Sequence, residues 1–136
     1  MTLNLDDLIF EVRDVLADIP DEWLDSSTIY KNIVAAYAFV NSICDVTEVN
    51  EELLKSAVVS LAAYYAYISF VSKLERELGS VPVATRERMN MLKNKARMFL
   101  TMISVVPITE DLTIDYERLG EYIPEMTLTY SVDEIY

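Results

Sequence analysis

The sequence contains no histidine, one cysteine, two glycines and four prolines among its 136 residues. The absence of histidine removes the commonest general base and the commonest metal ligand of proteins. Two glycines are too few for the many tight turns of a strand-rich domain, so helices are favoured. The single cysteine, Cys44, cannot form an intrachain disulfide, and the fold therefore does not depend on an oxidising compartment.

Acidic residues dominate the charge. There are 23 of them against 11 basic residues, which gives a formal charge of −12 and argues against a general binder of phosphate backbones. The charge is uneven, because residues 1–50 sum to −8, residues 51–104 to +3 and residues 105–136 to −7. With 52% hydrophobic residues, a chain of this length forms one domain with a sizeable core. These features indicate an acidic helical protein that binds other proteins.

The longest apolar run, residues 57–71, is interrupted only by two serines. Its 15 residues are fewer than the ~20 needed to cross a bilayer, so we interpret it as a buried helix. Asp6 and Asp7 also make the start of the chain unlike the basic start of a signal peptide. We therefore expect no membrane partner.

Apolar spacing predicts four helices, over about residues 5–17, 26–43, 51–78 and 82–103. Gly79 suits the end of the third helix, and Pro82 suits the first position of the fourth. The short link between them predicts an antiparallel hairpin. The predicted fold class is all-α: a four-helix-bundle-like subunit, residues 1–104, with a long central helical hairpin and an extended C-terminal arm, residues 105–136.

The predicted arm carries Pro107 and Pro124, which exclude a long helix, and eight acidic residues against one arginine. Residues 126–130 alternate like a single strand, which needs a partner edge. We expect the arm to become ordered by docking, on its own domain or on another subunit. Its candidate docking residues are Tyr116, Tyr122, Met126, Leu128, Tyr130 and Tyr136.

No residue pattern supports catalysis. The paired acids Asp6/Asp7, Asp21/Glu22 and Glu51/Glu52 stand at predicted helix starts or turns, where capping and the helix dipole explain them. The acids near residue 110 lack the spacing of a calcium loop, and no glycine-rich phosphate loop is present. Cys44, with apolar neighbours, is interpreted as a buried, inert thiol. We expect no enzymatic activity, cofactor or metal.

Four aromatic residues crowd the third predicted helix and point in several directions: Tyr64, Tyr65, Tyr67 and Phe70. Two interpretations are open. The other three helices surround this helix, or part of its surface is buried by another subunit, since tyrosine is common at interfaces.

The fourth predicted helix combines basic side chains with methionines: Arg86, Arg88, Lys93, Lys95 and Arg97 with Met91, Met98 and Met102. The first predicted helix carries an acidic stripe of Asp7, Glu11, Asp14 and Asp18. Either the two sets pair within one chain, or the basic face contacts an acidic segment of a neighbouring copy. The second interpretation makes both sets a subunit interface and implies head-to-tail association into a ring or a filament.

The layout resembles the head–tail connector (adaptor, or head-completion) proteins of tailed bacteriophages. The resemblance covers residues 3–104 and rests on the segment LADIPDEWLDSSTIYKNIVAAYAFVNSI, the aromatic helix SLAAYYAYISFVSKLEREL and the elbow at residues 79–82. The family implies a homo-oligomeric ring, commonly of twelve copies, at the head–tail junction of the virion. Such a ring binds the portal protein, carries the tail or the next connector, and lets genome DNA pass without specific binding.

The family also implies that a terminal extension, here residues 105–136, reaches the portal or an adjacent subunit. Strand addition by residues 126–130 is one mode of such docking. Before incorporation into the virion, the subunit would be in the host cytoplasm.

The leading hypothesis is therefore a non-enzymatic connector subunit. The alternative is an acidic inhibitor that mimics DNA and occupies a nucleic-acid-binding protein, as the charge of −12 and the acidic stripe suggest. The basic fourth helix and the high apolar content fit such a mimic poorly. An enzyme ranks third, because it would need a metal or cofactor site that the sequence does not encode.

Overall fold

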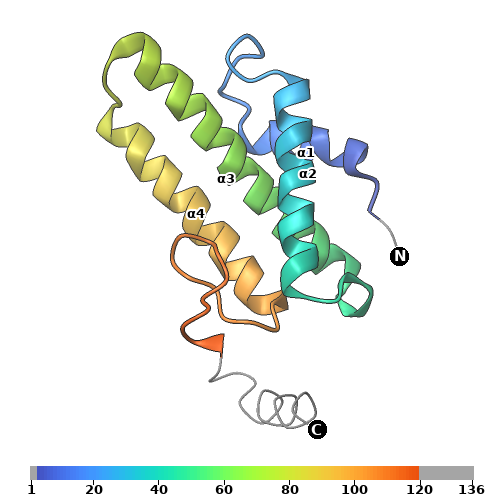
Figure 1. The fold of residues 1–136 in the computed structure, drawn as a ribbon. Coiled ribbons are helices and arrows are strands. Elements are labelled where there is room, and N and C mark those ends of the chain that lie inside the picture. Colours follow the sequence, from blue (N-terminus) through green and yellow to red (C-terminus); the bar gives the residue numbers. More distant parts are fainter. Residues whose placement is uncertain (1–2, 120–136) are drawn as a thin grey trace, which may run out of the picture.

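The computed structural model describes residues 3–119, and within this range the fold is all-α (Figure 1). Four α-helices and two short 3₁₀ turns account for its regular structure. The elements in chain order are η1 (Leu5–Asp7), α1 (Leu8–Val15), α2 (Ser26–Ile43), η2 (Val46–Glu48), α3 (Glu51–Leu78) and α4 (Val83–Ile103). The prediction of four helices in an all-α chain is confirmed.

The first helix is shorter than predicted. It opens as the 3₁₀ turn η1, with the Asn4 side chain accepting a hydrogen bond from the Asp6 amide, and it ends at Val15 rather than near residue 17. Leu16 leaves the helical conformation at φ −110° and ψ 33°. Leu16, Ile19 and Leu24, in and after this turn of the chain, are all buried.

Helix α2 begins, and helix α3 begins and ends, where the capping residues predict. The Asp25 carboxylate accepts a hydrogen bond from the Thr28 amide at the start of α2. The Asn50 side chain accepts from the amides of Glu52 and Leu53 at the start of α3. Gly79 ends α3 in the left-handed conformation, φ 77°, and its amide donates to the Glu75 carbonyl.

The prediction that Pro82 occupies the first position of α4 is wrong. Pro82 is the N-cap residue of that helix. Its ψ of 149° is extended, and its carbonyl accepts hydrogen bonds from the amides of Thr85 and Arg86. The N-cap residue need not be helical, and an amide missing at this position leaves no helical acceptor unpaired. Proline is therefore tolerated one residue earlier than its preference for the first turn suggests.

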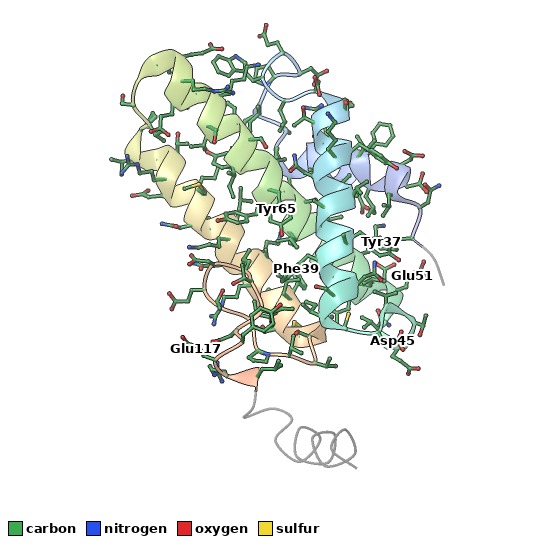
Figure 2. All side chains as sticks on the ribbon, in the orientation of Figure 1. Tyr37, Phe39, Asp45, Glu51, Tyr65 and Glu117 are labelled. Carbon is green, nitrogen blue, oxygen red and sulfur yellow. The ribbon has the colours of Figure 1, made fainter. Side chains whose placement is uncertain are left out.

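Helix α3 lies in the centre and packs against α1, α2 and α4 (Figure 1). Alanines on α3 let neighbouring helices approach closely, and Ala57, Ala62, Ala63 and Ala66 are fully buried. Side chains fill the space between the helices (Figure 2). The elbow at Gly79 returns α4 along α3, as the predicted hairpin requires.

The aromatic residues of α3 are covered mainly by this packing. Tyr67 is buried, whereas Tyr64, Tyr65 and Phe70 are half-buried against the core. Phe70 also meets the ring of Trp23 edge-on, with ring centroids 6.0 Å apart. Of the two interpretations left open, the arrangement favours the one in which the other helices surround α3.

Helix α3 is long and apolar enough, by length and composition alone, to cross a membrane, and 56% of its most apolar 18-residue stretch is buried inside the fold. Central helices of globular domains have the same composition, because they are packed on several sides. The contacts of α3 with three other helices account for its apolar character.

The first part of the predicted arm folds back onto the helices. The Val105 amide donates to the Ile43 carbonyl at 2.9 Å, and the Asp115 amide donates to the Pro107 carbonyl at 2.8 Å. Between them the chain makes a closed loop that buries Ile108 and Leu112, the latter at φ 63°. For this stretch, docking occurs on the chain's own domain.

Residues 120–136, including the strand predicted over residues 126–130, lie outside the described residues. So do the candidate docking residues Tyr122, Met126, Leu128, Tyr130 and Tyr136, whereas Tyr116 is described and exposed. The division into residues 1–104 and 105–136 stays a prediction.

Candidate interaction surface

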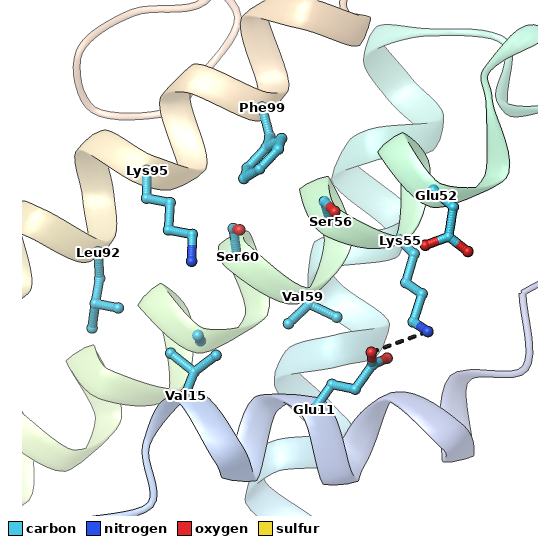
Figure 3. A pocket seen from close by; sticks show the side chains of 11 residues that line it. Glu11, Val15, Glu52, Lys55, Ser56, Val59, Ser60, Leu92, Lys95 and Phe99 are labelled. Carbon is cyan, nitrogen blue, oxygen red and sulfur yellow. Dashed lines mark ion pairs between the residues drawn. The ribbon is translucent and has the colours of Figure 1, made fainter.

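Two members of the acidic stripe form ion pairs within the chain. Glu11 of α1 pairs with Lys55 of α3 at 3.0 Å, as Figure 3 shows. The hydrogen bond to Glu11 raises the pKa of Lys55. Asp18 pairs with Arg88 of α4, and the hydrogen bond from Arg88 lowers the pKa of the Asp18 carboxyl. For Asp18, the interpretation that the stripe pairs with the basic set of the fourth helix inside one chain holds, whereas Glu11 pairs with a lysine of α3 instead.

The other two members remain exposed. Within residues 3–119 the carboxylates of Asp7 and Asp14 form no ion pair, and the same is true of Asp6. Phe10 lies among them and is 77% exposed, the most exposed large apolar side chain in the described chain. We call these four residues, Asp6, Asp7, Phe10 and Asp14, the α1 outer face.

The sequence interpretation missed Phe10, although its position carried a signal. The buried or half-buried residues Leu8, Ile9 and Val12 follow helical spacing toward the core. Phe10 falls on the opposite side of the helix from Val12, because two residues turn the chain by about 200°. An aromatic residue on the polar side of an amphipathic helix is expected to be exposed.

Three methionines line the outer side of α4. Met91 is 70% exposed, Met98 is 52% exposed and Met102 is 61% exposed. Their spacings of seven and four residues place them on one side of the helix, over a length of about 17 Å. We call them the methionine stripe. The sequence predicted Met91 and Met98 as interface residues, and their exposure leaves them free to serve as such.

Lys95 and Arg88 border the methionine stripe on one side, and Glu87 and Asn94 border it on the other, by helical spacing. Arg86, Lys93 and Arg97 lie further around the helix, about 120–160° from Met91. Arg88 and Lys93 have acidic partners inside the chain, Asp18 and Asp111, the latter at 3.9 Å. Lys95 and Arg86 are exposed and form no ion pair within the described range.

Arg97 is half-buried, and its Nε atom has no hydrogen-bond partner among residues 3–119. It lines a polar hollow of about 280 Å³ between α4 and the loop that follows it, together with Asn90, Lys93, Asn94 and Glu110. The recess thus holds two cations, two amides and one carboxylate, and Lys93 is also paired with Asp111.

A second hollow, of about 180 Å³, lies over α3 between α1 and α4 (Figure 3). Its walls include Val15, Val59 and Phe99, and the Glu11–Lys55 ion pair closes one end. Lys95 extends from α4 over this hollow, toward Ser60. The hollow thus adjoins the lysine border of the methionine stripe.

Cys44 is the C-cap of α2 and is buried, with its thiol donating a hydrogen bond to the Val40 carbonyl at 3.4 Å. Burial raises the pKa of this thiol, as expected of a structural cysteine. Among residues 3–119, the acidic and cysteine side chains do not gather into groups of three or more that could hold a metal ion.

Comparison with known proteins gives no relative: no family model matches the chain, and neither a curated protein nor a solved structure is significantly similar to it. The functional argument therefore depends on the chain's own surfaces.

Proposed function

We propose that the chain is a non-enzymatic structural subunit that assembles with copies of itself into a connector ring between the portal and the tail of a bacteriophage particle. The ring would extend the DNA channel. The observation that carries the proposal is the methionine stripe of α4, bordered by cations and exposed on a chain that is otherwise strongly acidic. The proposed location, the head–tail junction of the virion, comes from the resemblance to head–tail connectors.

The exposure of the stripe supports a binding role. Scattered apolar residues on a surface need no explanation, but an aligned set with a charged border is typical of an interface. Methionine side chains are flexible and polarisable, and they adapt to a partner's shape. An interface of this kind on a small helical domain fits a subunit of an assembly.

The subunit proposed here is four-helix-bundle-like, with α3 and α4 as its central hairpin and residues 105–136 as its arm. The arm would contact the portal or an adjacent copy, and the far side of the ring would carry the tail or the next connector. A net charge of −12 fits a channel through which DNA passes without sticking, because like charges repel. No cofactor enters this function.

The DNA-mimic alternative is less well supported. A mimic needs free carboxylates in a regular array, but Glu11 and Asp18 are engaged by Lys55 and Arg88. The cations of α4 would also meet the basic partner of a mimic with like charge. The pairing within the chain therefore favours an assembly subunit.

The test is the mass of the purified full-length chain in solution, alone and mixed with the portal protein of the same particle. A closed oligomer of many copies, or one that forms on the portal, is the expected result. A strict monomer that does not bind the portal would contradict the proposal.

A further inference from the structure

The methionine stripe brings three thioether sulfurs to one open side of α4. Met91, Met98 and Met102 are each more than half exposed. The side of α4 that packs into the fold is turned away from them and carries the buried residues Ala96 and Leu100. A thioether reacts with peroxides as the neutral group, so its exposure to solvent governs how fast it is oxidised. The stripe is therefore a place where an oxidant can reach sulfur.

The other sulfur atoms of the described chain are less accessible. Cys44 is buried, and its thiol donates a hydrogen bond to the Val40 carbonyl. Thiols react as thiolates, and burial raises the pKa of Cys44, which leaves little thiolate at neutral pH. Met89 is half-buried and packs against the core. Among residues 3–119, the most exposed sulfur atoms are thus those of the stripe.

We propose that the methionine stripe is an oxidation site, at which hydrogen peroxide converts an apolar surface into a polar one while the fold is retained. The reaction is a two-electron oxidation of sulfur. The thioether sulfur attacks one peroxide oxygen, and an S–O bond forms as the O–O bond breaks. The departing hydroxide takes the remaining proton and becomes water, and each methionine becomes its sulfoxide.

The fold does not depend on these three sulfur atoms. Side chains that stay in water contribute little to the core, so a polar oxygen added to them changes the surface and leaves the helix packing in place. The same change at Met89 would bring a polar group against the core. Position on α4 thus separates a modification of the surface from damage to the fold.

The consequence for assembly rests on the proposed function. If a neighbouring copy covers the stripe, three sulfoxides bring polar oxygens into an apolar contact, which is unfavourable unless each is hydrogen-bonded. Oxidised chains should therefore associate more weakly than reduced ones. Methionine sulfoxide reductases reverse the modification, so the stripe would be a reversible switch of assembly.

The experiment treats the full-length chain with hydrogen peroxide in a time course at neutral pH. Peptide masses follow each methionine separately, because one sulfoxide adds about 16 Da. Alkylation of the quenched samples in urea measures how much of the Cys44 thiol remains. Met89 is the internal control for exposure. Met102 and Cys44 line the same hollow, of about 380 Å³, and so compare a thioether with a thiol at one place.

Oxidation of Met91, Met98 and Met102 should be complete before half of Met89 and half of Cys44 have reacted. Circular dichroism of that sample should match the untreated chain. Sedimentation should show association at least about tenfold weaker, the effect of disrupting one interface anchor, and reductase treatment should restore it. Earlier oxidation of Cys44 or Met89, or loss of helix content when only the stripe is oxidised, would overturn the inference.

The matched variant carries Met91→Leu, Met98→Leu and Met102→Leu together, which keeps the apolar volume and removes the sulfur atoms. Peroxide should leave the association of this variant at its own untreated level. A variant that still loses association would place the sensitive group elsewhere and overturn the inference, as would a parent chain that assembles normally with its stripe fully oxidised. A parent chain that is monomeric before treatment would instead overturn the proposed function, and the order of oxidation would still decide whether the stripe is the oxidation site.

Discussion

Arg88 joins three parts of the chain through one side chain. Its guanidinium pairs with Asp18, donates to the Val15 carbonyl at 3.0 Å and lies over the Tyr67 ring, 5.2 Å from the ring centroid. The last turn of α1 and the segment after it are thereby fixed to α4. Arg88, which the sequence predicted at a subunit interface, thus makes its contacts within its own chain.

The Asp18→Asn variant should lower the free energy of unfolding at pH 7 by about 0.5 kcal/mol, the size of an exposed ion pair. Arg88 lowers the pKa of folded Asp18, so the stabilisation is complete above the unfolded value of about 4 and is lost as pH falls through the folded pKa. Urea unfolding at pH 7 and in acid should show the difference between parent and variant shrinking in acid. Asp14→Asn, which breaks no ion pair within the described chain, is the control. A difference that is the same at both pH values would contradict the assignment.

Gly79 is required for its backbone conformation and not for space. A Cβ atom at this position would meet no atom within 4 Å, but φ is 77°. Gly79→Ala should therefore destabilise the chain by about 1 kcal/mol, measured by thermal unfolding, because alanine is strained in the left-handed region. Gly79→Asn should cost less, since asparagine tolerates that region better. A stabilised Gly79→Ala variant would show that the end of α3 adopts another conformation.

At the scale of elements, local chemistry predicted much of the fold. The starts of α2 and α3 follow from Asp25 and Asn50, and the end of α3 follows from Gly79, because capping involves atoms a few residues apart. The end of α1 was wrong because the helical spacing of buried residues continues through Leu16 and Ile19, whereas the backbone already leaves the helical conformation at Leu16. Apolar spacing alone therefore does not locate this helix end.

The sequence also predicted only part of the candidate interaction surface, because spacing along the chain does not contain long-range contacts. Spacing alone placed Met91 and Met98 beside cations, and both are exposed. The pairing of Asp18 with Arg88, which are 70 residues apart, depends on how α1 crosses the other helices. Sequence patterns could therefore identify the acidic and basic sets, but they could not predict which members form ion pairs within the chain. Phe10 is uncharged, so the charge pattern that marks the acidic stripe does not include it.

The inner and outer sides of the α3–α4 hairpin should respond differently to truncation. Leu61 is fully buried in the centre of α3, so Leu61→Ala should lower the free energy of unfolding by about 2–5 kcal/mol. Met98→Ala, on the outer side of α4, should change the stability of the monomer by less than about 0.5 kcal/mol. Denaturant unfolding at low protein concentration measures both. A large loss in Met98→Ala would show that the stripe is covered within its own chain.

At the scale of the whole molecule, one chain buries part of its apolar surface against itself and leaves another part exposed. Residues 105–115 close onto the helices through Ile108 and Leu112, so this stretch needs no second copy. The methionine stripe and the α1 outer face remain exposed in the part of the chain that the structure describes. Exposed surfaces of this kind are what the proposed assembly into a ring would use.

The most direct test of this account is native mass spectrometry of the full-length chain, alone and with its portal. The account predicts one closed species with a fixed number of copies, and it predicts dissociation of that species into single chains by Met98→Glu. A parent chain that remains a single copy under both conditions, at concentrations where its helices are folded, would contradict the account.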